Sequence, residues 1–167
     1  MDAPLRFLDI LKLLVRHGVD FILVGGVAAI VEGAPISTLD LDVVVRPTPE
    51  NRERLLTALG ELNARYLDPA GRHIVPDRIK LETLRLHQLL TDFGPLDVLE
   101  RIGKGRSYED LLDHTRIYEV SGLPLRTLRL EMVIRSKEEA NRDKDRAALP
   151  VLRRTLQLQK GQSGEEG

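Results

Sequence analysis

Two aspartates stand two residues apart at the start of an apolar segment. Asp40 and Asp42 open the run Asp-Leu-Asp-Val-Val-Val that ends at residue 45. In a β-strand, residues i and i+2 point to the same side, so both carboxylates would face one way. Like charges at this spacing repel each other unless a cation lies between them, and Mg²⁺ prefers hard oxygen ligands. The spacing therefore predicts a divalent-cation site at the start of a buried strand.

A third carboxylate, Asp97, lies in the otherwise apolar stretch 96–99. A carboxylate in such a strand is costly to bury unless it is paired or bound to a metal, although an arginine could also pair with it. The preceding Asp-Phe-Gly-Pro sequence predicts a turn, which would place Asp97 on the second strand of a hairpin. Three acids on neighbouring strands could hold one or two Mg²⁺ ions for in-line phosphoryl displacement. Asp97 could also serve as the base toward an acceptor hydroxyl.

The chain also offers groups that could hold phosphates. Gly25-Gly26 follows the apolar run 21–24 and leads into a short expected helix, 27–32, where bare backbone N–H groups can bind an anion. The hydroxyls of Ser37 and Thr38 lie just before the paired acids. Taken singly, a double glycine is most often a plain turn and an Asp-x-Asp pair is often a cap. Together with the third acid they predict a phosphoryl-transfer site.

Bulk properties restrict the class of protein. The chain has 167 residues, a formal net charge of −1 and no cysteine. We expect one domain over residues 1–160 and a disordered tail over 161–167. Thiol chemistry and Cys-ligated metals are excluded, and the four histidines do not have the spacing of zinc ligands. No apolar run has membrane length and no signal peptide is evident, so we expect a cytoplasmic protein without membrane association.

Periodicity predicts strands alternating with helices, with one adjacent hairpin. This pattern favours an α/β or α+β fold in which a small mixed sheet is flanked by helices. The segment 65–78 is expected to be an irregular loop, because two prolines and a glycine interrupt any pattern. The expected helices are 3–17, 27–32, 49–62, 108–113, 127–140 and 142–159. The expected strands are 21–24, 39–45, 83–91, 96–99 and 116–120.

The order of these motifs resembles a known family. A hydrophobic run, Gly25-Gly26, a gap over residues 27–39, and then the Asp40/Asp42 pair resemble the signature of the DNA polymerase β-like nucleotidyltransferase superfamily. Asp97 matches the family's third acid on a later strand. The resemblance implies a nucleotidyltransferase-like fold with C-terminal helices packed alongside the sheet. It also implies dependence on Mg²⁺ and transfer of a nucleoside monophosphate from an NTP to a hydroxyl, with these three aspartates as the catalytic metal ligands.

A second segment, 137–145, resembles the Lys…Arg-x-Lys-Asp segment of small nucleotidyltransferases. This branch includes minimal nucleotidyltransferases and the toxin halves of abortive-infection toxin–antitoxin pairs. If 127–159 is nearly one helix, Lys137 and Lys144 lie on one face. Toxin-like relatives often carry an arginine at the position of Ile36, so this chain departs from their pattern. The resemblance implies that the nucleotide is bound by Lys137, Arg142, Lys144 and Asp145, and that an antitoxin or a second copy of the chain is a possible partner.

Several alternatives stay open at this point. The charged residues of 137–145 could be a solvated helix face. The acceptor hydroxyl could belong to a tRNA end, to a protein side chain or to an aminoglycoside-like antibiotic. The same scaffold could also bind a nucleotide or a partner without turning it over. The loop 103–106 could contact the phosphates of an acceptor, whereas a structural role is favoured for His87.

Overall fold

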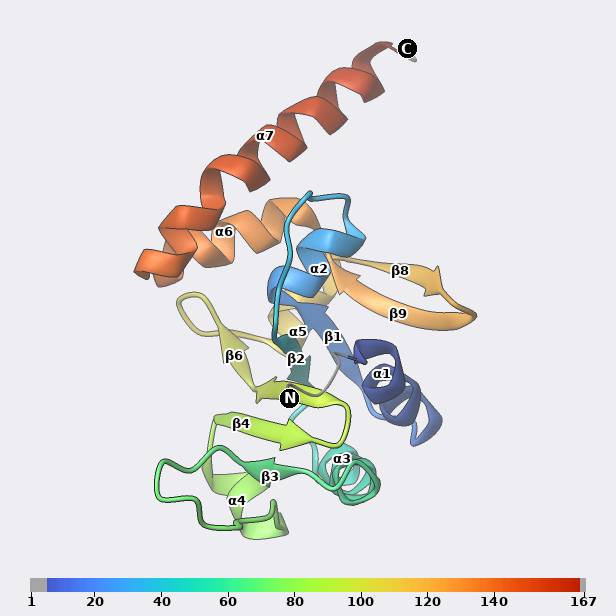
Figure 1. The fold of residues 1–167 in the computed structure, drawn as a ribbon. Helices are drawn as coiled ribbons and strands as arrows, with labels where there is room; N and C mark the ends of the chain where they lie inside the picture. The colour runs from blue at the N-terminus through green and yellow to red at the C-terminus, as the bar shows by residue number, and fades with distance from the viewer. Residues whose placement is uncertain (1–5, 166–167) are drawn as a thin grey trace.

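The computed structural model describes residues 6–165, in which seven strands form one mixed sheet in the order β3-β4-β5-β2-β1-β9-β8 (Figure 1). β1 is antiparallel to β2 and parallel to β9, and β2 is parallel to β5. Two antiparallel hairpins, β4–β5 and β8–β9, extend the sheet on either side. The mixed sheet predicted from the sequence is therefore confirmed. The strands are β1 (Phe21–Val24), β2 (Leu41–Val45), β3 (Arg65–Tyr66), β4 (Leu86–Thr91), β5 (Gly94–Leu99), β8 (Thr115–Val120) and β9 (Leu123–Leu128).

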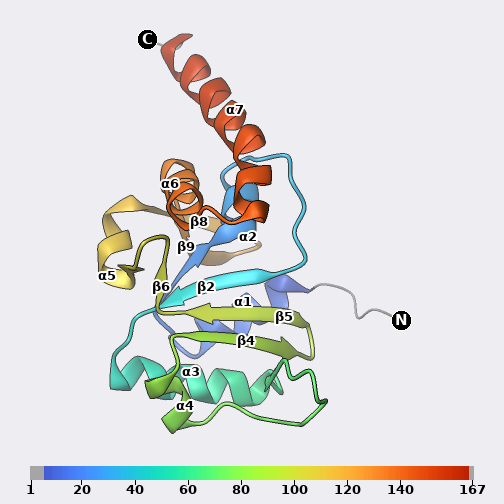
Figure 2. The ribbon, with the colours of Figure 1, turned by 90° about the vertical axis from the view of Figure 1, so that its left-hand side faces the viewer.

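Helices flank this sheet, and a small ladder of β6 (Arg101–Ile102) with β7 (Arg106–Ser107) follows β5. Figure 2 shows α2, α6 and α7 gathered on one side of the sheet and α3 and α4 on the other. α6 packs on both α2 and α7, and the far end of α7 projects away from the body. The helices are α1 (Phe7–Arg16), α2 (Gly25–Val31), α3 (Pro49–Glu61), α4 (Arg78–Thr83), α5 (Tyr108–Leu111), the 3₁₀ turn η1 (Leu112–His114), α6 (Leu130–Ala140) and α7 (Asp143–Glu165).

Local sequence signals explain where these elements begin. All four residues of β1 are buried, as expected for a central strand covered on both faces. Thr48 caps α3 by accepting a hydrogen bond from the Asn51 backbone N–H, and Pro49 occupies the first turn. Ser107 forms a capping box with Asp110 at the start of α5. These caps mark the starts of the helices expected over 49–62 and 108–113.

Strand register brings the acids together. In the parallel pair β2–β5, Asp42 lies opposite Asp97. In the hairpin β4–β5, Gln88 lies opposite Asp97, which places Asp97 on the second strand as predicted. Residues opposite each other in adjacent strands share a face of the sheet. One row across three strands therefore carries Gln88, Asp97 and Asp42 on the same face.

The structure corrects two predicted segments in the first part of the chain. The segment 65–78, expected to be irregular throughout, contributes the edge strand β3, which pairs with Leu89 and Leu90 of β4. Cross-strand pairing is long-range, so a local pattern interrupted by Pro69 could not reveal it. α2 begins at Gly25 itself and not after the double glycine. The part of the first helix predicted before residue 6 lies outside the described residues.

The C-terminal helices also differ from expectation. The helix predicted over 127–140 begins at Leu130, because Thr127 and Leu128 complete β9. The boundary expected between helices 127–140 and 142–159 is confirmed at Asn141, which adopts a left-handed conformation (φ 51°, ψ 38°) and ends α6. The condition that 127–159 is nearly one helix is therefore not met. Of the tail expected to be disordered over 161–167, the described part continues α7 as helix to Glu165, and residues 166–167 lie outside the described residues. Within residues 6–165, no helix combines the length and the apolar character needed to cross a bilayer.

Candidate active site

The predicted site residues line one cleft of about 650 Å³. Its walls come from α2, the segment before β2, the strands β4 to β6, and the junction of α6 with α7. The junction at Asn141 lies 115 residues along the chain from Gly26, and only the fold brings the two together. The predicted residues on its walls are Gly25, Gly26, Ser37, Thr38, Asp40, Asp42, Asp97, Lys137, Arg142, Lys144 and Asp145.

Asp42 and Asp97 form a pair of adjacent carboxylates on the cleft floor, and burial disfavours the charged form of both. Burial, the charge of Asp97 and a hydrogen bond between the two side chains together raise the pKa of Asp42 to about 7. Burial, followed by the charge of Asp40, also raises the pKa of Asp97. Asp40 itself is exposed and lies just before the first residue of β2. The pair therefore retains a proton near neutral pH unless a cation replaces it.

This pair is suited to a divalent cation that takes its remaining ligands from water and substrate. Among the described residues, no three His, Asp or Glu side chains converge closely enough to form a complete ligand set. Asp40 thus lines the cleft without closing a cage around Asp42 and Asp97. Mg²⁺ is commonly held by one or two carboxylates together with water and substrate phosphates, and not by a cage of protein ligands. The adjacent oxygens of Asp42 and Asp97 fit that role because their excess negative charge is incompletely balanced by the chain.

Glycine is required at positions 25 and 26 because the backbone there lies very close to the side chains of Asp42 and Thr38. Gly25 has φ +64°, and a Cβ atom there would overlap Oδ2 of Asp42. A Cβ atom on Gly26 would lie 2.9 Å from Cβ of Thr38. The Thr38 hydroxyl in turn accepts a hydrogen bond of 3.3 Å from the Asp40 backbone N–H, which orders the approach to β2. Glycine at both positions therefore lets the first turn of α2 lie against the acidic strand.

The second charged group lies where α6 meets α7. Asp145 is fully buried, and its carboxylate accepts hydrogen bonds from Nε of Arg142 at 2.7 Å and from the Arg142 backbone N–H at 3.1 Å. Nζ of Lys137 lies 3.6 Å from the same carboxylate. Burial alone would raise the pKa of Asp145, but the hydrogen bonds and charges of these two residues hold it below its usual range. Asp145 therefore orders the cations instead of facing a ligand.

Lys144 is placed differently from its neighbours at this junction. It is exposed, and its charge lowers the pKa of both Asp42 and Asp97. Ile36 also lines the cleft, at the position where toxin-like relatives often carry arginine. Arg46, the next arginine after Ile36 in the chain, does not line the cleft and forms ion pairs with Asp20 and Glu109. The cations of the cleft beside the acids are therefore those of the α6–α7 junction.

Sequence reasoning missed the cleft residues contributed by β4 to β6. Leu86, Gln88, Leu99, Arg101 and Ile102 line the side of the cleft beyond Asp97. The alternation of β4 around the predicted turn could have placed Leu86 and Gln88 on the same side as Asp97, because hairpin partners share a face.

Two other sequence candidates have structural partners. His87 is 2 % exposed, and its Nδ1 lies 2.7 Å from the Tyr66 hydroxyl, so the favoured structural role agrees with its position. In the loop 103–106, Arg106 makes two hydrogen bonds to the Glu139 carboxylate, and Nζ of Lys104 lies 3.8 Å from it. The loop is therefore tied to α6 at Glu139, while Gly103 lines the cleft.

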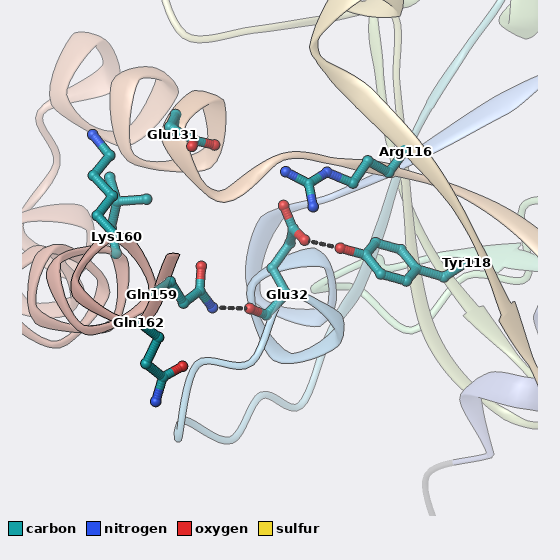
Figure 3. Close-up of a pocket in the computed structure, with 8 residues that line it drawn as sticks. Glu32, Arg116, Tyr118, Glu131, Gln159, Lys160 and Gln162 are labelled. Carbon is teal, nitrogen blue, oxygen red and sulfur yellow. Dashed lines mark hydrogen bonds between the residues drawn. The ribbon is translucent and has the colours of Figure 1, made fainter. Parts of the chain in front are cut away.

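A second cavity, of about 380 Å³, lies under the projecting half of α7 (Figure 3). The carboxylate of Glu32 accepts hydrogen bonds there from the Tyr118 hydroxyl and, at 2.7 Å, from the Leu130 backbone N–H. Gln159 donates a hydrogen bond of 2.5 Å to the Glu32 carbonyl. Glu32 thus joins α2, β8, α6 and α7, and its polar groups are used in doing so. The cleft with the paired acids is the stronger candidate for a chemical site.

Comparison with known proteins gives the fold class. No protein-family model matches the chain, and no curated protein matches it by sequence. A Thermotoga maritima protein described as a candidate nucleotidyltransferase matches with a TM-score of 0.56 and 16% identity over 89% of this chain and 94% of that one. ANT(2″)-Ia in complex with adenylyl-2″-tobramycin matches with a TM-score of 0.58 and 14% identity over 92% of this chain and 89% of that one.

A third solved structure agrees with these two. The lincosamide antibiotic adenylyltransferase LnuA, bound to lincomycin, matches with a TM-score of 0.60 and 12% identity over 88% of this chain and 94% of that one. The chain therefore has a nucleotidyltransferase-like fold, shared with antibiotic adenylyltransferases. At these identities the likeness establishes the fold and leaves the activity to be argued from the cleft.

Proposed function

We propose that this protein is a Mg²⁺-dependent nucleotidyltransferase that transfers a nucleoside monophosphate from an NTP to a hydroxyl acceptor. The observation that carries the proposal is the Asp42–Asp97 pair, which lies beside a glycine turn and a group of cations in one cleft of a nucleotidyltransferase-like fold. Asp40, Asp42 and Asp97 are the proposed metal ligands and catalytic residues.

The reaction follows from these positions. The acceptor oxygen attacks the α-phosphorus of the NTP while the bond from that phosphorus to the bridging oxygen breaks and pyrophosphate leaves. The proton of the acceptor hydroxyl goes to the Asp97 carboxylate, which lies opposite Asp42 and Gln88 in the cleft. When bound, Mg²⁺ would neutralise negative charge on the triphosphate and on the carboxylates around it.

The remaining cleft residues hold the nucleotide in this proposal. Ser37 and Thr38 donate hydroxyl hydrogen bonds to phosphate oxygens. The close turn at Gly25-Gly26 lets the phosphates approach the backbone. Lys137, Arg142 and Lys144 supply positive charge to the triphosphate, and Asp145 acts by holding the first two of these in position. Placement of three cations near the leaving pyrophosphate favours its departure.

The structure matches favour a small-molecule acceptor as one version of the proposal, since two of the matched enzymes modify or bind antibiotics. The resemblance of segment 137–145 to small toxin-like nucleotidyltransferases supports another version, in which the acceptor is a tRNA end or a protein side chain and an antitoxin is the partner. Growth arrest on expression, relieved by co-expression of a neighbouring gene, would distinguish the toxin version. Resistance to an antibiotic on expression would distinguish the other.

The direct test is incubation of the purified protein with Mg²⁺ and each of the four radiolabelled NTPs, together with RNA, protein and antibiotic acceptors. We expect label to enter one acceptor class, with matching pyrophosphate release, and we expect Asp42→Asn to abolish it. Asp143→Asn is the matched control, because Asp143 pairs with Arg146 at an exposed position outside the cleft. Stabilisation by Mg²⁺–NTP without pyrophosphate release would instead indicate a non-catalytic binding module.

A further inference from the structure

The cleft has a second half that the proposed nucleotide contacts do not use. It lies over β4 and β5, on the side of Asp97 away from the cations. One row across the strands carries Gln88, Asp97 and Asp42, and the next row on the same face carries Leu86 and Leu99. Because side chains on one face recur every second residue, the leucine row lies one repeat, roughly 7 Å, from the acids. A group that reaches Asp97 from this side must lie on the leucines.

These leucines form an apolar floor that faces the cleft. Leu86 is 49% exposed, while its strand neighbours His87 and Leu89 face the core and are 2% and 0% exposed. Leu99 and Ile102 are half-buried beside it and line the same cleft. Exposed apolar surface that adjoins a polar reaction site is typical of a ligand-binding wall.

The charges around this floor are the second observation. The acids that line the cleft in the described part of the chain are Asp40, Asp42, Asp97 and Asp145. The first three belong to the proposed cation site, and the fourth is fully buried and paired. No further carboxylate lines the cleft there to receive an ammonium group. The charged side chain beyond Asp97 is instead Arg101, whose Nη1 donates a hydrogen bond of 2.8 Å to the Gly105 carbonyl.

We propose that the floor formed by Leu86, Gln88 and Leu99 binds the acceptor, and that it selects an uncharged or anionic hydroxyl compound with an apolar face over a polycation. This inference rests on the proposed function and specifies its acceptor. Gln88 lies beside Asp97 and is exposed, so its amide can bind the acceptor next to the reacting hydroxyl. The leucines cover the apolar face, and Arg101 disfavours positive charge on the far side.

A matched series of three alkyl sugars tests the selection by charge. Hexyl β-D-glucoside, its uronic acid and its 2-amino-2-deoxy analogue share a ring and an apolar chain but differ in charge. Binding of each is measured by NMR titration without nucleotide but with saturating Mg²⁺, so that the metal ion and not the ammonium group balances the acids, at concentrations below micelle formation. We expect the neutral and anionic sugars to bind at least about 5-fold more tightly than the amine, a difference of roughly 1 kcal/mol. Equal binding, preference for the amine or no binding would overturn the proposal.

Variants locate the effect on this floor. Leu86→Glu adds a carboxylate where the floor is exposed, and we expect it to reverse the preference in favour of the amine. Leu84→Glu is the matched control, since Leu84 is 44% exposed and does not line the cleft. Arg101→Gln should remove any advantage of the anionic sugar over the neutral one. An unchanged preference in Leu86→Glu, or a reversal in Leu84→Glu, would contradict the assignment.

The same samples separate this inference from the proposed function. Mg²⁺–NTP binding, measured by calorimetry, reports on Asp42 and the cations and does not involve Leu86. Loss of charge selection with intact Mg²⁺–NTP binding would overturn the acceptor assignment alone. Charge selection without any Mg²⁺–NTP binding would instead contradict the proposed function and leave the floor as a binding site for such hydroxyl compounds.

Discussion

The cleft contains carboxylates at two places, Asp145 at the α6–α7 junction and the pair Asp42 and Asp97 on the floor, and their pKa values are shifted in opposite directions. At the α6–α7 junction, Asp145 is fully buried but paired with Arg142 and Lys137, and its pKa is held below the usual range. On the floor, Asp42 and Asp97 are less buried but face each other, and the pKa of both is raised. The difference lies in the partners, since both groups lose hydration.

This contrast shows at which of the two places the chain itself supplies the counter-charge. Asp145 receives its counter-charges from the chain, so it orders two cations without needing a ligand. The floor pair receives only partial compensation, from Lys144 and, at Asp42, from Arg142, so its remaining negative charge is available to a cation from solution. A site whose charge is balanced only when a cation binds is expected where function requires that cation.

The largest effect is expected from removing charge at the floor. Asp42→Asn should lower the rate of nucleotidyl transfer by about 10³-fold, because the variant loses a ligand that stabilises charge in the transition state. The initial rate with the best acceptor found in the screen measures this. Asp143→Asn should retain the wild-type rate, and an equal loss in both variants would mean that the floor pair has no special role.

The opposite group should respond in stability. Asp145→Asn leaves Arg142 and Lys137 without their buried counter-charge, and we expect the free energy of unfolding to fall by about 3 kcal/mol. Urea denaturation at pH 7 measures the loss, and Asp143→Asn should change the same quantity by less than about 0.5 kcal/mol. If Asp145→Asn is as stable as the wild type, the junction is not held by this ion group.

A smaller effect is expected from pH. The folded-state pKa of Asp42 is raised from 3.8 to about 7, so between these pH values the folded state binds more protons than the unfolded state. Stability of the metal-free protein should therefore fall as pH rises through this window relative to Asp42→Asn. The whole shift corresponds to about 4 kcal/mol, and solvent screening at this partly exposed pair reduces the expected loss to about 2 kcal/mol. Urea denaturation at pH 4.5 and pH 8 measures it. Mg²⁺ should restore part of the loss at pH 8 in the wild type only.

The smallest effect concerns the exposed cation between the two groups. Lys144→Ala should weaken Mg²⁺–NTP binding by about 5- to 10-fold, close to 1 kcal/mol, with little change in stability. Lys160→Ala provides the matched control, because Lys160 is also exposed on α7 but lines the other cavity. Calorimetric titration distinguishes them, and equal affinities in the two variants would remove Lys144 from the nucleotide site.

Much of the fold could be predicted because its signals are local. The apolar run before Gly25, the cap at Thr48 and the turn before Asp97 each appear within a few residues, and the structure contains the corresponding elements. The edge strand β3 was missed, because cross-strand pairing leaves little trace in local periodicity. The break at Asn141 matches the boundary between the helices expected over 127–140 and 142–159, but its left-handed conformation was not predicted.

The sequence indicated the charged residues that line the cleft, but not its apolar wall or its geometry. Charge and spacing selected residues that line one cleft, since carboxylates in apolar strands are conspicuous in a sequence. That Asp145 is buried and paired while Lys144 is exposed depends on how α7 leaves Asn141, which no local pattern shows. Nothing in the residue types of Leu86 and Gln88 indicates a site, and only the register of β4 with β5 places them beside Asp97.

The most direct test of the central claim is the coupling between Mg²⁺ and NTP at the floor pair. Calorimetric titration of each NTP, with and without Mg²⁺, is carried out on the wild type, Asp42→Asn and Asp143→Asn. We predict that Mg²⁺ increases NTP affinity by about 10- to 100-fold in the wild type and in Asp143→Asn, and that Asp42→Asn loses this increase. The same Mg²⁺ dependence in all three proteins would contradict the account.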